Sequence, residues 1–265
     1  MFNSFIIPIL LLTVSGVVVT AILFTAAKYM AVPVDEKAAK IREVLPSANC
    51  GACGYAGCDA YSEAVAKGEA ACNLCIPAGA AGGEKIAAIM GLAFEGVEAK
   101  KAFVKCNGTC SKTKPAVKYD GISSCKACAM LYGGNGSCSF GCLGYGDCVD
   151  ACGFDSIHIV DGIALVDKTM CTGCEACVGA CPKDIIEMIP ERNTVKVACS
   201  SKASPKVSMQ VCEVSCIACK KCEKECPHDA IHVKDFLAKI TADKCTNCGK
   251  CIPVCPHGCI IRQSC

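Results

Sequence analysis

Cysteine constrains this chain more than any other residue type, because 29 of its 265 residues are cysteines. Such a density occurs in short secreted domains held by disulfides, or in chains whose thiolates bind metal. Here the cysteines fall in runs separated by two or three residues, too close for a comfortable disulfide but suited to thiolates that converge on one metal centre. An odd total also prevents complete pairing within the chain. The pattern predicts reduced, metal-bound thiolates in a reducing compartment.

One motif, C-x2-C-x2-C-x3-C followed by proline, occurs three times. Three thiolates from such a loop bind irons of a [4Fe–4S] cube, and in two-cluster ferredoxins the fourth cysteine binds the other cluster. The proline turns the chain away from the loop. A zinc ribbon would separate two C-x2-C pairs by a longer stretch, so the motif favours iron–sulfur ligation over zinc. The copies are Cys171, Cys174, Cys177, Cys181 with Pro182; Cys216, Cys219, Cys222, Cys226 with Pro227; and Cys245, Cys248, Cys251, Cys255 with Pro256.

A fourth run, CSFGCLGYGDCVDAC, is irregular and has Gly153 where the other runs have proline. Its last cysteine, Cys152, nevertheless precedes the next run by the same 19 residues as Cys226 does. A repeated interval is typical of tandem copies of one structural unit. We therefore predict two tandem two-cluster ferredoxin modules, at 138–189 and 216–265.

Exchange of the fourth cysteine between the two runs of each module predicts four [4Fe–4S] clusters. Membership in these ligand sets is better founded than the pairing, because the crossing is inferred from the ferredoxin rule. The sets are Cys138, Cys142, Cys148 with Cys181; Cys171, Cys174, Cys177 with Cys152; Cys216, Cys219, Cys222 with Cys255; and Cys245, Cys248, Cys251 with Cys226.

A different cysteine set lies nearer the N-terminus, where Cys50, Cys53 and Cys58 follow the spacing C-x2-C-x4-C. Two downstream residues, Cys72 and Cys75, compete for the fourth place. Cys75 stands just before a proline and a glycine-rich turn, which is a loop position, whereas Cys72 is closer to the preceding helical segment. We therefore favour Cys75, which gives the chain at least five clusters.

The remaining cysteines allow one more centre. Two closely spaced pairs could together hold a sixth cluster or a zinc ion, or could be ordinary thiols packed beside the modules. The candidate set is Cys106, Cys110, Cys125 and Cys128. We expect Cys199, Cys212, Cys259 and Cys265 to be unligated. The histidines His158 and His232 occupy equivalent places in the two modules, and a structural role is favoured over ligation.

The run from Phe5 to Ala27 contains no charged residue, and its 23 residues are enough to cross a bilayer as one helix. A cleaved signal peptide is the competing interpretation, but the leading MFNS has no positive charge and the apolar stretch is long for a signal core. Basic residues come after the run, and the positive-inside rule then places the rest of the chain in the cytoplasm. The sequence thus predicts a single-pass protein of the cytoplasmic membrane, with membrane lipid around its anchor and its clusters on the cytoplasmic side. The basic residues are Lys28, Lys37, Lys40 and Arg42.

The predicted fold class is α+β, small and metal-stabilised, with one transmembrane helix, a 4Fe-4S domain and tandem two-cluster ferredoxin-like modules. A formal net charge of only +2 gives no basis for nucleic-acid binding. The expected segments are an anchor at 1–28, a connector at 29–45, the N-terminal 4Fe-4S domain at 46–96, a cysteine-containing linker region at 97–137, a module at 138–189, a connector at 190–215 and a module at 216–265.

This order of an anchor, a C-x2-C-x4-C-x16-C domain and ferredoxin modules resembles RnfB, the B subunit of Rnf-type (Rsx) ion-translocating oxidoreductase complexes. The likeness extends over essentially the whole chain and is carried by NCGACGYAGCDAY, CNGTC, YDGISSC and GCLGYGDCVDAC. Gly153 departs from the usual proline, and the doubled module with Cys110 and Cys128 exceeds the short form of the family.

The resemblance implies an electron-relay subunit without a catalytic site of its own. Such a subunit takes electrons from a low-potential donor, typically soluble reduced ferredoxin. It passes them to partner subunits of the membrane complex, including flavin-bearing ones, and the complex moves Na⁺ or H⁺ across the membrane. The set of Cys50, Cys53, Cys58 and Cys75 would then hold the membrane-proximal cluster.

Two other functions fit parts of the pattern. A membrane-anchored polyferredoxin subunit of a hydrogenase or dehydrogenase would share the cluster motifs, but the N-terminal cysteine domain favours the Rnf-type subunit. A cysteine-rich zinc scaffold without redox activity would be colourless, whereas an iron–sulfur protein has broad visible absorption that bleaches on reduction.

Overall fold

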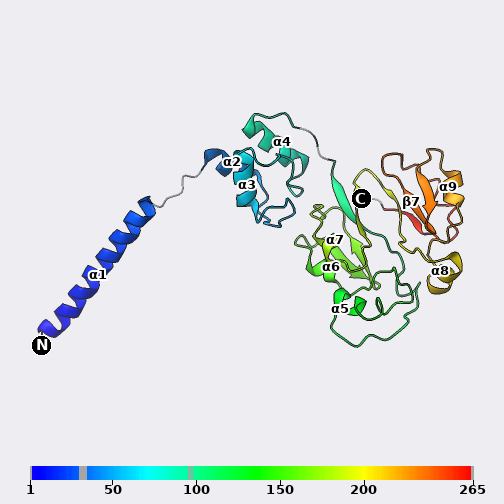
Figure 1. Ribbon diagram of the computed structural model, residues 1–265, viewed down its shortest axis with the longest axis horizontal. Helices are drawn as coiled ribbons and strands as arrows, with labels where there is room; N and C mark the ends of the chain where they lie inside the picture. The colour runs from blue at the N-terminus through cyan, green and yellow to red at the C-terminus, as the bar shows by residue number, and fades with distance from the viewer. Residues whose placement is uncertain (1, 30–34, 95, 97, 264–265) are drawn as a thin grey trace.

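The computed structural model describes residues 2–29, 35–94, 96 and 98–263. In chain order these residues form a long N-terminal helix, a small helical domain and a larger body of short strands and helices (Figure 1). The mixed helix–strand character expected from the sequence is confirmed.

The N-terminal helix, α1 (Phe2–Tyr29), has described side chains at Leu10 and at 13–26. Threonine hydroxyls within it donate to carbonyl oxygens one turn earlier, as Thr20 Oγ1 does to Gly16 O at 2.8 Å. Over the residues that the structure describes, no helix is long and apolar enough to cross a membrane. Part of the predicted span (5–9, 11, 12 and 27) falls outside the described side chains, and the anchor stays a prediction.

The helical domain consists of α2 (Glu36–Val44), α3 (Cys58–Ala66) and α4 (Gly79–Met90). The helix α2 begins at the N-cap Asp35, whose carboxylate accepts a hydrogen bond from the Lys37 amide at 2.9 Å. The helix α4 ends at Gly91 in the left-handed region, φ +69°, which glycine adopts without strain. The core of the helical domain is one apolar cluster that includes Ile41, Leu45, Tyr61, Val65 and Ile86. These apolar residues close the domain around the N-terminal cysteine set.

Four two-stranded antiparallel sheets form the framework of the C-terminal body. Short helices lie between the strands, and three of them are followed directly by a cysteine as their C-cap. The pairs are β1 (Lys100–Val104) with β4 (Ile186–Pro190), β2 (Ile157–Val160) with β3 (Ile163–Val166), β5 (Val195–Val197) with β8 (Ile260–Arg262), and β6 (Ile231–Lys234) with β7 (Leu237–Ile240). The helices are α5 (Cys125–Ala129), α6 (Asp147–Asp150), α7 (Ala176–Ala180), α8 (Pro205–Val211) and α9 (Lys221–Glu225).

The body contains the same unit twice. The hairpins β2–β3 and β6–β7 pair in the same register, with Ile157 opposite Val166 and Ile231 opposite Ile240. Each unit is closed by a second pair that joins its first strand to its last, β1 to β4 and β5 to β8. The strands β1 and β5 come from segments that the cysteine pattern assigned to a linker and a connector. Both units therefore extend beyond the expected module bounds, because apolar residues of these strands complete the cores.

Candidate iron–sulfur sites

The three regular cysteine loops share one backbone conformation. The second and fourth residues after the first cysteine have positive φ in every copy. Alternation of right- and left-handed residues turns successive amide N–H groups inward, a geometry that many iron–sulfur sites use to bind negatively charged groups. The residues are Gly173 and Glu175 (φ 81° and 66°), Ala218 and Lys220 (53° and 58°), and Asn247 and Gly249 (58° and 78°).

These loops gather their own three thiols and a fourth from the neighbouring run. The third cysteine of each loop shows which thiols lie together. Its pKa is raised to about 11, first by burial and then by the charges of the three thiolates around it. The groups are Cys177 with Cys171, Cys174 and Cys152; Cys222 with Cys216, Cys219 and Cys255; and Cys251 with Cys245, Cys248 and Cys226. The structure thus brings together the crossed sets expected for two-cluster ferredoxins.

The irregular run folds into the same loop, with one cysteine position changed. Gly144 and Gly146 have φ values of 75° and 90° at the second and fourth places after Cys142. Tyr145 therefore stands where the other loops have their middle cysteine. Cys142 takes the first place in this loop, which the cysteine spacing had assigned to Cys138.

The missing middle thiol is supplied by Cys125. A small cavity is lined by Cys125, Cys142, Cys148 and Cys181. Burial, followed by the charges of the other three thiolates, raises the pKa of Cys148 to about 12. The structure therefore groups Cys125, rather than the predicted Cys138, with Cys142, Cys148 and Cys181.

Asp147 holds Cys125 in position. Its carboxylate accepts hydrogen bonds from the backbone amides of Cys125 at 2.7 Å and Lys126 at 2.9 Å, and from Ser124 Oγ at 3.0 Å. Burial acts to raise the pKa of Asp147, but the amide and hydroxyl hydrogen bonds outweigh it and lower the pKa below its usual value. The ionised Asp147 carboxylate therefore fixes the first turn of α5 beside Cys148, the next residue in the chain.

The N-terminal set also comes together. Burial first, and then the charges of Cys58, Cys53 and Cys50, raise the pKa of the Cys75 thiol. The Asn49 side chain accepts a hydrogen bond from the Cys58 amide at 2.9 Å and so fixes the start of α3. Burial alone raises the pKa of Cys72, which packs in the apolar core of the domain. The geometry favours Cys75 as the fourth member.

The structure separates the four cysteines considered for a sixth centre. Cys125 joins the set just described, and Cys110 is exposed, with its amide donating to Asp161 O at 2.9 Å. Cys128 is fully buried and its sulfur lies 3.7 Å from the Asn135 side-chain oxygen. Cys106 lines a different cavity. These four residues do not form one site.

Cys259 takes part in the site of the second module without replacing a motif cysteine. It is buried, and its sulfur lies 3.5 Å from that of Cys255. The hydrogen bond from the Cys259 thiol is the main reason why the pKa values of Cys255 and Cys216 fall below the ordinary range. The Cys259 thiol keeps its proton and donates to the two neighbouring thiolates, because those hydrogen bonds raise its pKa.

The N-terminal set lies beside the first module. Gly173, between Cys171 and Cys174, adopts φ +81°, and a Cβ placed there would meet Lys100 O and lie 3.3 Å from Cγ2 of Ile76. Ile76 directly follows Cys75. The residue after Cys75 therefore packs beside the loop that carries Cys171 and Cys174.

The donor chemistry fits iron–sulfur clusters. No disulfide joins the cysteines from Cys50 to Cys259 that the structure describes, and within the described ranges no three metal-binding side chains come close enough to hold a single ion. Thr172 Oγ1, inside one cysteine loop, is buried without a hydrogen-bond partner. The Ala230 amide donates to Cys226 Sγ at 3.4 Å. Three of the four-thiol groups line small cavities, as [4Fe–4S] ligation requires.

Known protein families match the cysteine-rich parts of the chain. Residues 45–77 match the family described as "Putative Fe-S cluster". Residues 170–231 and 215–259 match two families described as 4Fe-4S dicluster domains. The matched regions contain the N-terminal set and all three regular cysteine loops.

Three similar proteins cover most of the chain. The B subunit of the Na⁺-translocating ferredoxin:NAD⁺ oxidoreductase complex of Acetobacterium woodii is 40% identical, over 92% of this chain and 74% of that protein. The B subunit of an ion-translocating oxidoreductase complex of Methanosarcina acetivorans is 38% identical, over 86% and 87%. The B subunit of the proton-translocating ferredoxin:NAD⁺ oxidoreductase complex of Clostridium ljungdahlii is 37% identical, over 90% and 84%.

Proposed function

Because the chain belongs to the B-subunit family of ion-translocating oxidoreductase complexes, we propose that it is the electron-transfer subunit of such a complex. It carries electrons from a low-potential donor, reduced ferredoxin, to the flavin-bearing membrane subunits of the complex. The complex as a whole couples this transfer to translocation of Na⁺ or H⁺. The similar proteins include one named for each ion, so family membership alone does not select between them.

The observation that carries this proposal is the series of four-thiol rings along the chain. A bound [4Fe–4S] cluster supplies reversible one-electron chemistry at a potential set by burial and by hydrogen bonds to its sulfurs. The chain's own residues supply the thiolates, exclude water and aim amides inward. The five ligand sets are Cys50, Cys53, Cys58, Cys75; Cys152, Cys171, Cys174, Cys177; Cys125, Cys142, Cys148, Cys181; Cys216, Cys219, Cys222, Cys255; and Cys226, Cys245, Cys248, Cys251.

The contact of Ile76 with the Gly173 loop supports an order for these sets. The N-terminal set adjoins the Cys171 loop, and the crossing of fourth cysteines joins the two sets within each module. We propose that the N-terminal set is the end of the row nearest the membrane. The C-terminal module is then the end that meets the soluble donor.

We also propose that α1 is a single-pass membrane anchor. Described side chains of α1 such as Val17, Val19 and Phe24 are apolar and 69%, 54% and 72% exposed. At about 100° per residue, Val17 and Phe24 lie on one side of the helix and Val19 lies on the opposite side. A helix that is apolar all round is suited to lipid. The basic residues that follow it in the sequence favour a cytoplasmic location for the cluster domains.

The proposal is tested by anaerobic purification of the full chain from membranes. We expect broad visible absorption that bleaches with dithionite, and co-purification with flavin-bearing membrane subunits. Membranes containing the complex should oxidise reduced ferredoxin, and alanine at Cys174 or Cys219 should slow that oxidation. A colourless zinc-containing protein, or isolation with a hydrogenase, would overturn the proposal.

A further inference from the structure

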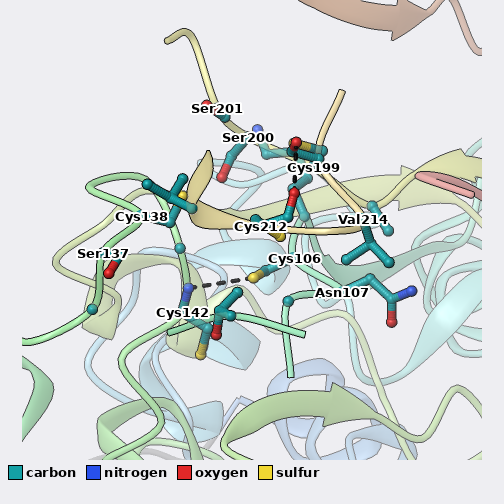
Figure 2. Close-up of a pocket in the computed structure, with 18 residues that line it drawn as sticks. Cys106, Asn107, Ser137, Cys138, Cys142, Cys199, Ser200, Ser201, Cys212 and Val214 are labelled. Carbon is teal, nitrogen blue, oxygen red and sulfur yellow. Dashed lines mark hydrogen bonds between the residues drawn. The ribbon is translucent and has the colours of Figure 1, made fainter. Parts of the chain in front are cut away.

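Four cysteines outside the five ligand sets meet in one cavity between the two ferredoxin units. They come from four separate segments: Cys106 after β1, Cys138 before the first cysteine loop, Cys199 after β5 and Cys212 after α8. Figure 2 shows them around the same space, with the dashed line from the Cys142 amide to the Cys106 sulfur. No short sequence motif connects these positions, and none of the proposed ligand sets uses them.

The four residues form two equivalent pairs, one from each unit. Cys106 and Cys199 each lie two residues after the first strand of their unit, β1 and β5. Cys138 and Cys212 each lie four residues before the cysteine that opens the following loop. Each unit thus contributes one thiol from its first strand and one from the approach to its first loop. Recurrence of both positions in a duplicated fold is the pattern expected of a shared site.

The same hydrogen bond recurs in both halves. The Cys142 amide donates to Cys106 Sγ at 3.4 Å, and the Cys216 amide donates to Cys199 Sγ at 3.3 Å. Cys142 and Cys216 are the first cysteines of their loops. Amide donors of this kind stabilise thiolates and are characteristic of cluster ligands. The cavity is therefore linked on each side to the nearest ligand set of one unit.

The space between the thiols suits a cluster. The cavity volume is about 50 Å³, compared with about 20 Å³ at the Cys125, Cys216 and Cys245 sets. A Cβ added at Gly108 would lie 3.3 Å from Cys212 Sγ and 3.7 Å from Cys106 Sγ, and 2.8 Å from the Thr113 methyl group. Both sulfurs therefore lie next to Gly108, where any larger residue would crowd them and the Thr113 methyl group.

Contacts across the two units fix the segments that carry the thiols. Ser200 Oγ, next to Cys199, donates to Phe140 O at 2.7 Å in the loop that begins at Cys138. Thr113 and Cys212 form an antiparallel bridge, reinforced by the Glu213 amide donating to Lys112 O at 3.1 Å. These contacts hold the segments that carry Cys138, Cys199 and Cys212 in fixed places beside the cavity.

We propose that Cys106, Cys138, Cys199 and Cys212 ligate a sixth [4Fe–4S] cluster, shared by the two ferredoxin units, that makes the row of clusters continuous. This inference rests on the proposed function of the other five sets. The site gains one electron from a neighbouring set and loses one to the next, with no bond made or broken. In the resulting order the N-terminal set is followed by the Cys171 set, the Cys142 set, the shared site, the Cys216 set and the Cys245 set.

The test is iron, sulfide and zinc quantitation on the full chain after anaerobic reconstitution, together with EPR of oxidised and reduced samples. Wild type should hold about 24 iron atoms, the content of six clusters. Cys199→Ala and Cys212→Ala should each lose about four iron atoms, or about one with a new three-iron signal in the oxidised sample. The matched control is Cys110→Ala, an exposed cysteine outside every ring, which should leave the iron content unchanged.

Each alternative outcome has a distinct meaning. A wild-type content of about 20 iron atoms, unchanged in both variants, would overturn the shared cluster and leave the five-set relay intact. One zinc per chain that is lost in both variants would also overturn it. If neither variant folds, the wild-type count and its reduced EPR signals decide alone. Absence of iron–sulfur absorption from wild type would instead overturn the proposed function itself.

Discussion

The N-terminal cysteine domain and the C-terminal body hold their thiols in opposite ways. In the domain, all four thiols come from the one segment 50–75, and the core formed by α2, α3 and α4 serves that site alone. In the body, every ring takes at least one thiol from a distant segment, and each of the two cores contains cysteines of two different rings. The first is a local site and the second a network, so loss of one ligand should have different consequences in each.

The largest expected difference concerns cluster loss. Metal binding supplies much of the folding free energy of small metal-stabilised units, about 10–16 kcal/mol at structural zinc sites. Cys53→Ala should remove about four iron atoms from the N-terminal domain and leave the body loaded. Cys219→Ala should remove about eight, because Cys226 and Cys255 cross between two sets that share one core. Iron quantitation and limited proteolysis measure both; equal losses would show that the body is as modular as the domain.

The second prediction concerns the substituted ligand. If Tyr145 occupies the place of a middle cysteine, then Cys125→Ala should cost about eight iron atoms, because its set shares a core with the crossed Cys171 set, and adding Tyr145→Cys should restore them. The reason is that Gly144 and Gly146 already give the loop its regular conformation. The double variant is measured by iron content and reduced EPR against each single variant. Failure of Tyr145→Cys to rescue would mean that the loop positions are not equivalent.

Asp147 allows a smaller test of how the network places a distant ligand. Asp147→Ala removes hydrogen bonds to the Cys125 and Lys126 amides, and bonds to a charged acceptor contribute about 1.5–3 kcal/mol. We expect faster loss of one cluster to a chelator, with the other sites unaffected. Asp150→Ala, on the exposed side of the same short helix, is the matched control. Equal rates of cluster loss to the chelator in the two variants would show that Asp147 does not stabilise the Cys125 site.

The smallest expected effect lies in the local domain. Burial raises the pKa of Tyr61 to about 12, and its hydroxyl donates to Ala71 O at 2.8 Å. Between pH 10 and 12 the unfolded chain loses the phenol proton while the folded domain keeps it, so stability falls as pH rises, by up to about 3 kcal/mol.

Thermal unfolding of the domain at pH 10, 11 and 12 measures this dependence. Tyr61→Phe should lower stability at neutral pH by about 1 kcal/mol and flatten the pH dependence. Tyr55→Phe, whose ring lies 5.6 Å from that of Tyr61, is the matched control and should keep it. A pH dependence that survives in Tyr61→Phe would assign the effect to another group.

Sequence could predict what is local in this molecule. The spacing of Cys171, Cys174 and Cys177 determines a loop, and the ferredoxin rule supplies its crossed partner. The N-terminal set is also local: Cys75 is favoured over Cys72 because it stands just before the proline and the glycine-rich turn that follow it. The repeat of the 19-residue interval also leads to the paired hairpins β2–β3 and β6–β7.

What sequence reasoning missed is non-local. Cys125 joins the loop in which Tyr145 stands at the place of the middle cysteine. Asp147 holds the start of α5 against that loop, and the spacing of the cysteines does not reveal this contact. Cys199 and Cys212 were expected to be unligated, because each stands alone in the sequence. One clue was present: Cys212 precedes Cys216 by the same interval as Cys138 precedes Cys142. The interval alone does not predict a site, because the other two thiols, Cys106 and Cys199, are placed by the strands β1 and β5.

The central claim is that every thiol ring in this structure holds a redox-active cluster. Integration of the EPR spins of the full chain, reduced anaerobically to completion, tests it most directly. We expect about six one-electron centres per chain, falling to about five in Cys199→Ala and in Cys53→Ala. A fully reduced chain without iron–sulfur spins, or one whose spin count is unchanged by both substitutions, would contradict it.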